Sequence, residues 1–311
     1  MSSTILQMAI IMGCGSIWRW LTPRGLDAQL TRQVITSSVF YVFLPALIID
    51  VLWHAELGVK SLQYSALGVL SIIMTLSVSF LGGRLLRLPA QQMGAVLLAT
   101  AFPNVTFLGL PVLEQLFGPW ARSVVIQIDL FAVAPFLFTV GIVIVRHYGA
   151  DTQESQSNSL GSFLNAPPFW SMFIAVALNL MGVNSPDWLS SVLQRLANAV
   201  IPLMLFSMGL ALSWHAVKLN KLPIALVVVV LKMLFMPWVA LHIVQTMDFL
   251  PQYQAAAVLD IAMPSMLMGV VLCDRYQLDS ALYAMLVTIT TAVSVVTLPF
   301  WHQFLAKSLA F

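Results

Sequence analysis

Three ionisable residues stand well inside long apolar runs: Asp129, Lys232 and Asp260. At the centre of a membrane helix such a residue costs roughly 2.5 to 3.5 kcal/mol, even on the scale derived from insertion experiments. Lys232 is therefore expected to be neutralised by Asp129 or Asp260 in a structural pair. A functional interpretation is that Lys232 counters an anionic substrate, or that an acidic residue titrates. Both interpretations hold together if one carboxylate exchanges Lys232 for the substrate.

Two prolines followed by polar residues lie at the centres of two further apolar runs, as Pro103-Asn104 and Pro264-Ser265. A proline removes one backbone hydrogen bond and clashes with the preceding turn, so both helices should break at mid-depth. The freed backbone groups need partners, and the N-terminal helix ends favour anions. Asp260 lies one helical turn before Pro264, on the same face. The expected substrate-binding residues are Pro103, Asn104, Thr106, Met263, Pro264 and Ser265, with Asp129, Lys232 and Asp260 as charge or coupling residues.

The composition surrounding these residues is that of a membrane protein. Of 311 residues, 60% are hydrophobic and 8% are charged, whereas an average soluble domain has about 25% charged residues. The 14 Lys and Arg and the 12 Asp and Glu are too few to solvate a soluble protein of this size. The expected surroundings are therefore lipid. The net charge of +2 gives no nucleic-acid signature, so the expected partners exclude nucleic acid.

We expect an all-α integral membrane protein with ten transmembrane helices. The apolar runs reach the about 20 residues that a spanning helix needs, and they lack the short alternating segments of a barrel. The predicted spans are 4–20, 31–53, 62–86, 91–117, 120–146, 167–183, 188–213, 222–247, 253–275 and 279–305. The single long hydrophilic stretch, within 148–166, leaves five spans on each side of it.

The two halves of the chain resemble each other. Leu88, Pro89, Gln92, Ala95, Val96, Leu97, Ala101 and Pro103 recur at a nearly constant spacing as Leu250, Pro251, Gln254, Ala257, Val258, Leu259, Ala262 and Pro264, and Trp53-His54-Ala55 recurs as Trp214-His215-Ala216. Because each half has an odd number of spans, the second half should enter the membrane in the opposite orientation. Such inverted repeats are typical of secondary transporters.

Basic residues on alternate sides of the predicted spans orient the chain. One side carries Arg19, Arg24, Arg32, Arg84, Arg87, Arg146, Lys218, Lys221 and Arg275, and the other carries Lys60, Arg122, Arg195 and Lys307. The side richer in Lys and Arg should be cytoplasmic. We therefore expect a multi-pass protein of the cell (inner) membrane, with both termini outside and the central connection in the cytoplasm.

The stretch 103–111, Pro-Asn-Val-Thr-Phe-Leu-Gly-Leu-Pro, with the following Leu116-Phe117-Gly118, resembles the fourth-helix signature of the auxin efflux carrier family. This family includes bacterial organic-acid permeases of the malonate and malate transporter type. Further agreement lies in 232–237, Met263-Pro264-Ser265 with Arg275-Tyr276, and Thr290-Thr291 through Trp301. The resemblance covers essentially the whole chain. It implies two inverted five-helix repeats in which broken helices four and nine cross.

The resemblance also implies a domain division. Residues 1–61 and 167–221 would form a scaffold, 62–147 and 222–311 a transport (crossover) domain, and 148–166 a cytoplasmic connecting loop. It implies passage of small carboxylates such as malonate, malate or auxin-like acids by alternating access, in homodimers joined through the scaffold helices. The long cytoplasmic loop of the plant members is absent from this chain.

The leading hypothesis is thus a secondary transporter of a small organic anion. We expect no cofactor and no metal, and leave H⁺ or Na⁺ open as coupling ion. One alternative is a sodium or proton exchanger of related crossed-helix architecture, which the neutral pair Asn104 and Ser265, without adjacent acids, disfavours. A membrane-embedded enzyme would need clustered nucleophile, base or metal ligands, which the pattern lacks. A structural or sensor protein would gain nothing from broken helices and buried charges.

Overall fold

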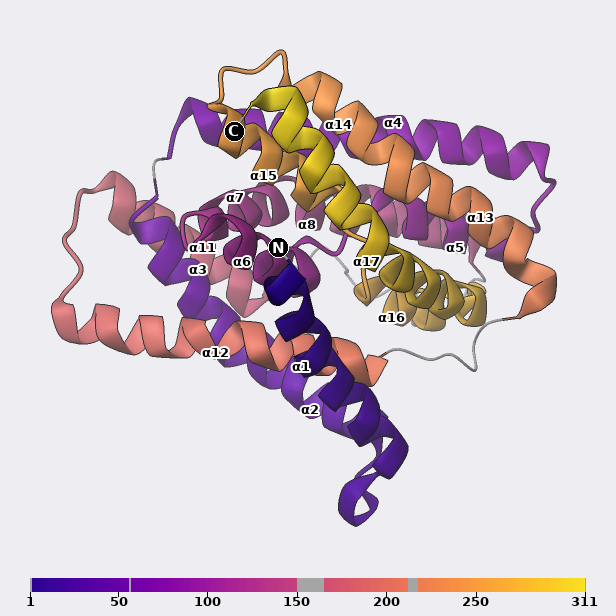
Figure 1. Ribbon diagram of the computed structural model, residues 1–311, viewed down its shortest axis with the longest axis horizontal. Helices are drawn as coiled ribbons and strands as arrows, with labels where there is room; N and C mark the ends of the chain where they lie inside the picture. The colour runs from indigo at the N-terminus through magenta and orange to yellow at the C-terminus, as the bar shows by residue number, and fades with distance from the viewer. Residues whose placement is uncertain (1, 56, 150–164, 212–217, 311) are drawn as a thin grey trace. The chain divides into compact units, whose positions relative to one another are not determined.

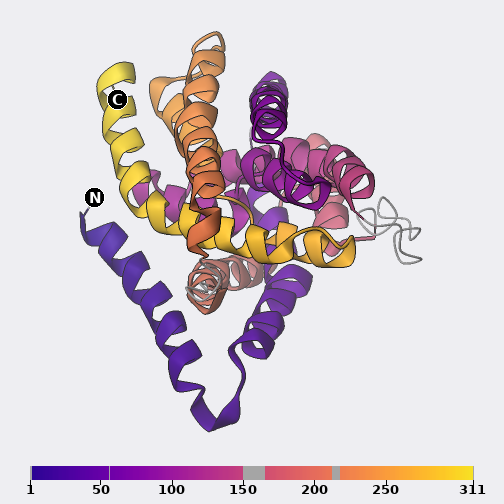
Figure 2. The ribbon, with the colours of Figure 1, turned by 90° about the vertical axis from the view of Figure 1, so that its right-hand side faces the viewer.

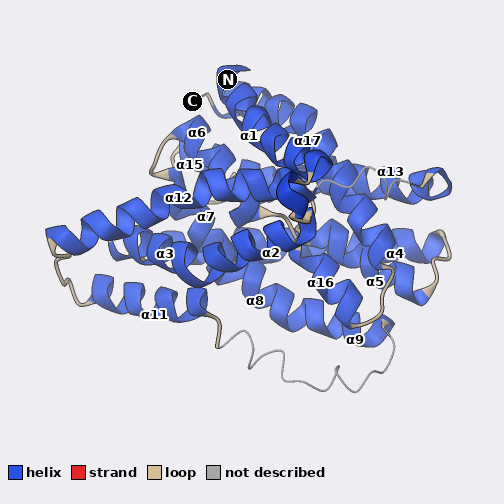
Figure 3. Cartoon of the chain, turned by 90° about the horizontal axis from the view of Figure 1, so that it is seen from below, coloured by secondary structure: helices blue, strands red, loops and turns tan. Residues whose placement is uncertain are grey.

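In a computed structural model of the chain, the described residues are 2–55, 57–149, 165–211 and 218–310. Throughout these ranges the chain is helical, and it forms no strand beyond one isolated bridge (Figure 3). The helices are α1 (Ser2–Leu21), α2 (Ala28–Ser38), α3 (Leu44–Trp53), α4 (Val59–Leu85), α5 (Ala90–Ala101), α6 (Leu110–Phe117), α7 (Ala121–Ile128), α8 (Ala134–Phe136), α9 (Ile142–Tyr148), α11 (Pro167–Leu180), α12 (Asp187–Ala211), α13 (Leu222–Val230), α14 (Met236–Val244), α15 (Pro251–Ile261), α16 (Met268–Arg275) and α17 (Ser280–Leu309).

Several helical stretches have the length and composition of membrane spans, which confirms the predicted all-helical class. Within the described ranges, six stretches are long and apolar enough: Ala28–Trp53, Val59–Leu85, Ala121–Tyr148, Asp187–Ala211, Leu219–Val244 and Ser280–Leu309. Two shorter apolar helices are Val105–Phe117 and Pro167–Leu180. The ten-span count and the inverted repeat stay predictions at this point.

Wide π-helical turns let prolines enter the long helices. The turns Val39–Phe43, Val105–Gly109, Asp129–Val133 and Leu231–Phe235 end two residues before Pro45, Pro111, Pro135 and Pro237, respectively. Proline has no N–H, and its ring clashes with the carbonyl four residues earlier, so a wider turn relieves both conflicts. Pro202 and Pro299 instead lie inside α12 and α17. α17 bends along its length (Figure 2).

The chain folds into two compact units. The first unit comprises Met1–Ser61, Thr106–Ile126 and Gly161–Leu212, and the second comprises Leu62–Val105, Gln127–Leu160 and Ser213–Phe311. The predicted scaffold and transport domains stay a prediction. The segment Thr106–Ile126, expected in the transport part, clusters with the first unit.

In the first unit, α12 is the central element. α1 and α2 diverge from a short turn as a V (Figure 2) and both contact α12, while α3 lies beside α11 and α12 (Figure 1). Gly15 and Gly209 let α1 and α12 approach closely, because a Cβ at either position would overlap backbone atoms of the other helix. Asn179 on α11 donates to the carbonyl oxygens of Leu52 and Trp53 at 3.0 and 2.8 Å, which caps the end of α3.

In the second unit, α5, α15 and α17 form the core around the helix breaks. α15 contacts α14 and α17, and α5 contacts α9, α16 and α17. The hydroxyl of Thr100 donates to Oγ of Ser79 at 2.8 Å, which joins α5 to α4. The indole of Trp301 donates to the carbonyl oxygen of Met233 at 2.8 Å.

Two features predicted from the sequence lie outside the described residues. These are residues 150–164, most of the central connection, and the second copy of the repeated triplet, Trp214-His215-Ala216.

Candidate functional site

The two predicted helix breaks lie against each other in the second unit. α5 ends at Ala101, and α15 ends at Ile261 before α16 begins at Met268. After these helix ends, Pro103 and Ser265 form an isolated antiparallel bridge. The N–H of Asn104 donates to the carbonyl oxygen of Pro264 at 2.8 Å, and the N–H of Met266 donates to that of Phe102 at 3.1 Å. The crossing therefore supplies backbone partners that each broken helix lacks.

Ser265 joins three elements at this crossing. Its hydroxyl donates to the carbonyl oxygen of Ala99 at 2.7 Å, near the end of α5. Its N–H donates to Oγ1 of Thr290 on α17 at 3.2 Å. Thr290 in turn donates to the carbonyl oxygen of Leu286 at 2.8 Å. A short polar side chain after the proline thus satisfies a helix-end carbonyl that would otherwise be orphaned.

The predicted binding residues are deeply buried. Ser265 and Met263 are 0% exposed, Asn104 is 2% and Thr106 is 4% exposed. Pro103 and Pro264 are buried beside them. Thr106 begins the part of the chain that clusters with the first unit, whereas the other five belong to the second. These groups are therefore closed to solvent in this structure.

The start of α16 depends on two residues that the sequence analysis did not single out. The hydroxyl of Tyr283 donates to the carbonyl oxygen of Met266 at 2.8 Å. A Cβ at Gly269 would overlap the ring and hydroxyl of Tyr283. Gly269 is therefore needed for Tyr283 to reach the crossing. A third residue, Thr290, also contacts the crossing. It belongs to the stretch quoted for the family resemblance, and its polarity inside a long apolar helix could have indicated this contact.

Lys232 is fully buried in the π-helical turn Leu231–Phe235. Its Nζ donates to Sδ of Met236 at 3.1 Å. The amine extends along its own helix toward Met236, one turn ahead. The Asp260 carboxylate oxygens have no hydrogen-bond partner among the described residues, so Lys232 does not bond to Asp260. The predicted pairing of Lys232 with an acidic residue stays a prediction.

Asp260 is also fully buried, in the last turn of α15. Neither carboxylate oxygen has a hydrogen-bond partner in the described residues. Asp129, half-buried on another helix of the second unit, lies within electrostatic range of Asp260. The sequence argument against an ion exchanger relied on the lack of neighbouring acids at Asn104 and Ser265. The structure brings two acids into range of each other, one of them a single helical turn before Pro264.

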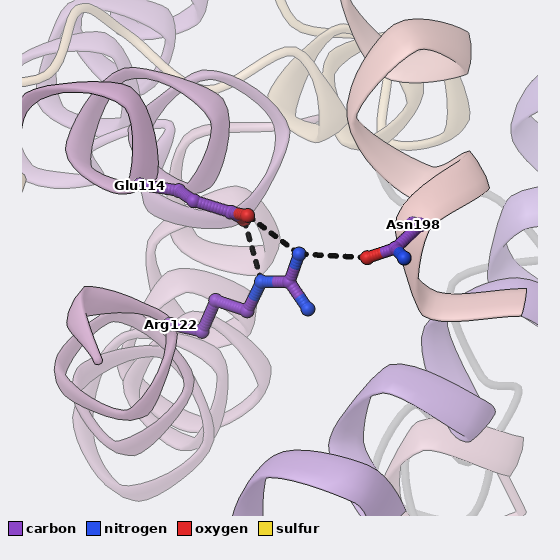
Figure 4. Close-up of polar contacts among 3 residues, drawn as sticks. All are labelled: Glu114, Arg122 and Asn198. Carbon is purple, nitrogen blue, oxygen red and sulfur yellow. Dashed lines mark hydrogen bonds and ion pairs between the residues drawn. The ribbon is translucent and has the colours of Figure 1, made fainter. Parts of the chain in front are cut away.

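A polar contact in the first unit was not foreseen. Nε of Arg122 donates to Oε2 of Glu114 at 2.6 Å, and an Nη donates to Oε1 of Glu114 at 2.5 Å and to Oδ1 of Asn198 at 2.9 Å (Figure 4). The Arg122 and Glu114 side chains are only 13% and 16% exposed. This bidentate pair fixes α6 to the start of α7, and the third bond extends it to α12.

Six helical stretches of membrane length among the described residues, together with two shorter helices whose breaks meet, are features of a multi-pass membrane transporter. A family model described as a membrane transport protein matches residues 1–302. The chain belongs to this family, the auxin efflux carrier family, as its fourth-helix sequence suggested.

Relatives from several organisms share most of the chain's length. An uncharacterized transporter of Methanothermobacter thermautotrophicus is 27% identical over 305 residues, covering 96% of this chain and 97% of its own. An uncharacterized transporter of Methanocaldococcus jannaschii is 24% identical, with 89% and 91% covered. The uncharacterized transporter YfdV of Escherichia coli K12 is 24% identical over 202 residues, 64% of each chain. Both family and relatives are transporters, which supports transport over membrane-embedded catalysis.

Proposed function

We propose that this protein is a secondary transporter that carries a small organic anion, a carboxylate such as malonate, malate or an auxin-like acid, across the cytoplasmic membrane. The crossing of the two broken helices would be the binding site. The observation that carries this proposal is the antiparallel pairing of Asn104 with Pro264 and of Met266 with Phe102. Irregular backbone at membrane depth is tolerated where it is buried in protein or lines a cavity, and in transporters it forms binding sites.

The charges near the crossing suit an anion. α16 begins just after it, and the N-terminal end of a helix favours negative charge. Lys232 belongs to the same unit and has a thioether, not a carboxylate, as its hydrogen-bond partner. A buried ammonium without an acidic partner favours the arrival of an anion. The substrate carboxylate would therefore act as the counter-charge of Lys232.

The crossing also supports the inverted repeat. By the spacing found in the sequence, Pro103 is equivalent to Pro264, and Asn104 to Ser265. In the structure Pro103 pairs with Ser265, and Asn104 with Pro264. The two pairs are exchanged when each residue is replaced by its equivalent in the other repeat. A two-fold axis between the repeats would produce this symmetry. Ten spans in two inverted repeats would account for this relationship. In the proposed mechanism, a scaffold domain and a transport domain move against each other.

The charge distribution sets the proposed orientation. Both termini would lie outside the cell and the central connection in the cytoplasm. The scaffold helices would join two copies of the chain. Alternating access accounts for the burial of Asn104 and Ser265, because each side would reach them only in its own conformation.

Uptake into proteoliposomes by the purified full chain tests the proposal. A panel of mono- and dicarboxylates, including malonate, malate and indole-3-acetate, is offered with and without unlabelled competitor. We expect saturable uptake of at least one of them and exchange against the same anion preloaded inside. Failure of every carboxylate to be taken up, exchanged or bound would contradict the proposal.

A cation exchanger is the second candidate, favoured by the electrostatic interaction between the two acids Asp129 and Asp260. Such an exchanger would move sodium or protons without any organic anion. Proteoliposomes containing a pH-sensitive dye distinguish the two functions. Sodium-driven proton flux in the absence of carboxylates would favour the exchanger.

A further inference from the structure

Asp260 is an unusual group for the interior of a membrane protein. Its side chain is 0% exposed, and neither carboxylate oxygen meets a hydrogen-bond donor among the described residues. Its backbone carbonyl, by contrast, accepts from the N–H of Met263 at 3.2 Å. A buried ionised carboxylate without a donor is strongly disfavoured, so it must be accompanied by a cation or a proton.

The surroundings of Asp260 increase this need. The residue lies in the last turn of α15, where the carbonyl end of the helix carries partial negative charge. Asp129 adds a second acidic group within electrostatic range. Lys232 is hydrogen-bonded to Met236 and does not neutralise Asp260. The Asp260 carboxylate itself therefore has no hydrogen-bonded positive side chain among the described residues.

The helices packed against α15 do not supply such a side chain either. α14 has one titratable side chain, His242, which is exposed. α17 has three: Tyr283, whose hydroxyl donates to Met266, the half-buried His302, and Lys307, which is exposed near the end of the helix. In the described residues none of these groups forms a hydrogen bond with the Asp260 carboxylate.

We propose that Asp260 is the proton-binding site that couples anion transport to the proton gradient, an inference that rests on the proposed function. A hydronium ion on one side of the membrane loses a proton to the carboxylate, so one of its O–H bonds breaks and an O–H bond forms on Asp260. On the other side that O–H bond breaks, and the proton returns to water. The organic anion crosses in the same cycle. Asp260 lies four residues before Pro264, so a change in its charge acts on the half-helix that ends at the crossing.

A proton fits this position better than a metal ion. Among the described residues, no three His, Cys, Asp or Glu side chains are grouped as metal ligands. A proton needs only the carboxylate itself, whereas hard cations take about six or more oxygen ligands.

Proteoliposomes containing the full chain test this site in two transport modes. Exchange of labelled for unlabelled anion needs no net proton movement, whereas accumulation of the anion does. One proton per anion allows about tenfold accumulation for a gradient of about one pH unit. We expect Asp260→Asn to keep exchange but lose proton-driven accumulation, and Asp260→Glu to recover it. Asp274→Asn, an exposed aspartate on α16, is the matched control.

The outcomes separate this inference from the proposed function. Proton-driven accumulation by Asp260→Asn equal to that of the wild type, or wild-type accumulation driven by sodium and indifferent to protons, would overturn the coupling site. Absence of any anion exchange by the wild type would instead contradict the proposed function. Infrared difference spectra on changing pH give a readout without substrate. A protonated-carboxyl band that Asp260→Asn removes is expected, and a band that is the same in both proteins would overturn the assignment.

Discussion

The backbone N–H of Asn104 lies 2.8 Å from the carbonyl oxygen of Pro264 and donates a hydrogen bond to it. Both partners of this bond are main-chain atoms, so the bond itself does not depend on the Asn104 side chain. A substitution of that side chain therefore changes the chemistry of the crossing without removing this bond. The side chain of Ser265, in contrast, contributes to the crossing itself through Ala99.

Ser265→Ala should destabilise the protein. The substitution leaves the buried carbonyl oxygen of Ala99 without its donor, and an unsatisfied buried polar group costs about 1 to 3 kcal/mol. Thermal unfolding in detergent should show a lower midpoint than the wild type. Ser77→Ala is the control, because Ser77 is exposed and its hydroxyl bonds only within its own helix. Equal midpoints for the two variants would show that Ser265 does not stabilise the crossing.

Arg122→Gln should destabilise the first unit. Glu114 would keep its charge in a largely buried position while losing a bidentate partner, which costs about 1.5 to 3 kcal/mol for bonds to charged groups. The double change with Glu114→Gln should recover part of the loss, since no unpaired charge remains. Chemical denaturation of the single and double variants measures this coupling. Strictly additive losses would show that the pair contributes nothing beyond its separate side chains.

Lys232→Met should weaken anion binding without weakening the fold. The change removes a buried ammonium that lacks an acidic partner, so stability should stay the same or rise. A charged contact worth about 1.5 to 3 kcal/mol corresponds to about a ten- to hundredfold loss of affinity. Binding of the transported anion and thermal unfolding are measured on the same preparation. Wild-type affinity in this variant would show that Lys232 is not the counter-charge.

Accessibility of introduced cysteines tests the proposed orientation. Asn184 and Asn220 are both exposed and fall on opposite sides of the predicted membrane. In a background without Cys14 and Cys273, an impermeant thiol reagent added to intact cells should label Asn184→Cys at once. Asn220→Cys should react only after the membrane is permeabilised. The reverse labelling pattern would invert the topology derived from the basic residues.

The helix breaks could be predicted from the sequence because proline acts locally. The missing N–H of Pro103 and of Pro264 ends a hydrogen-bond ladder whatever the surroundings, and the structure ends α5 and α15 just before them. Other helical prolines lie in helices that continue past them. A π-helical turn precedes Pro237, whereas Pro202 and Pro299 lie inside α12 and α17.

The partners of the buried side chains could not be predicted, because they depend on rotamers and helix rotation. The pattern placed Lys232 and Asp260 at similar depth, but the Lys232 amine bonds to Met236 on its own helix. The bond from Ser265 to Thr290 joins residues on separate helices, and one-dimensional spacing gives no such contact. The types and positions of the candidate site residues could thus be predicted from the sequence. Their hydrogen-bond partners could be identified only from the three-dimensional structure.

The central claim is that the crossing binds the substrate, and the anion affinity of Asn104→Ala tests it most directly. Isothermal titration of the purified variant with the transported carboxylate is compared with Asn220→Ala, an exposed control. We expect Asn104→Ala to keep its unfolding temperature, because the backbone bond to Pro264 remains. Its affinity should fall by at least about tenfold, the loss of roughly one buried hydrogen bond to a charged group. Wild-type affinity in a well-folded Asn104→Ala protein would contradict the account.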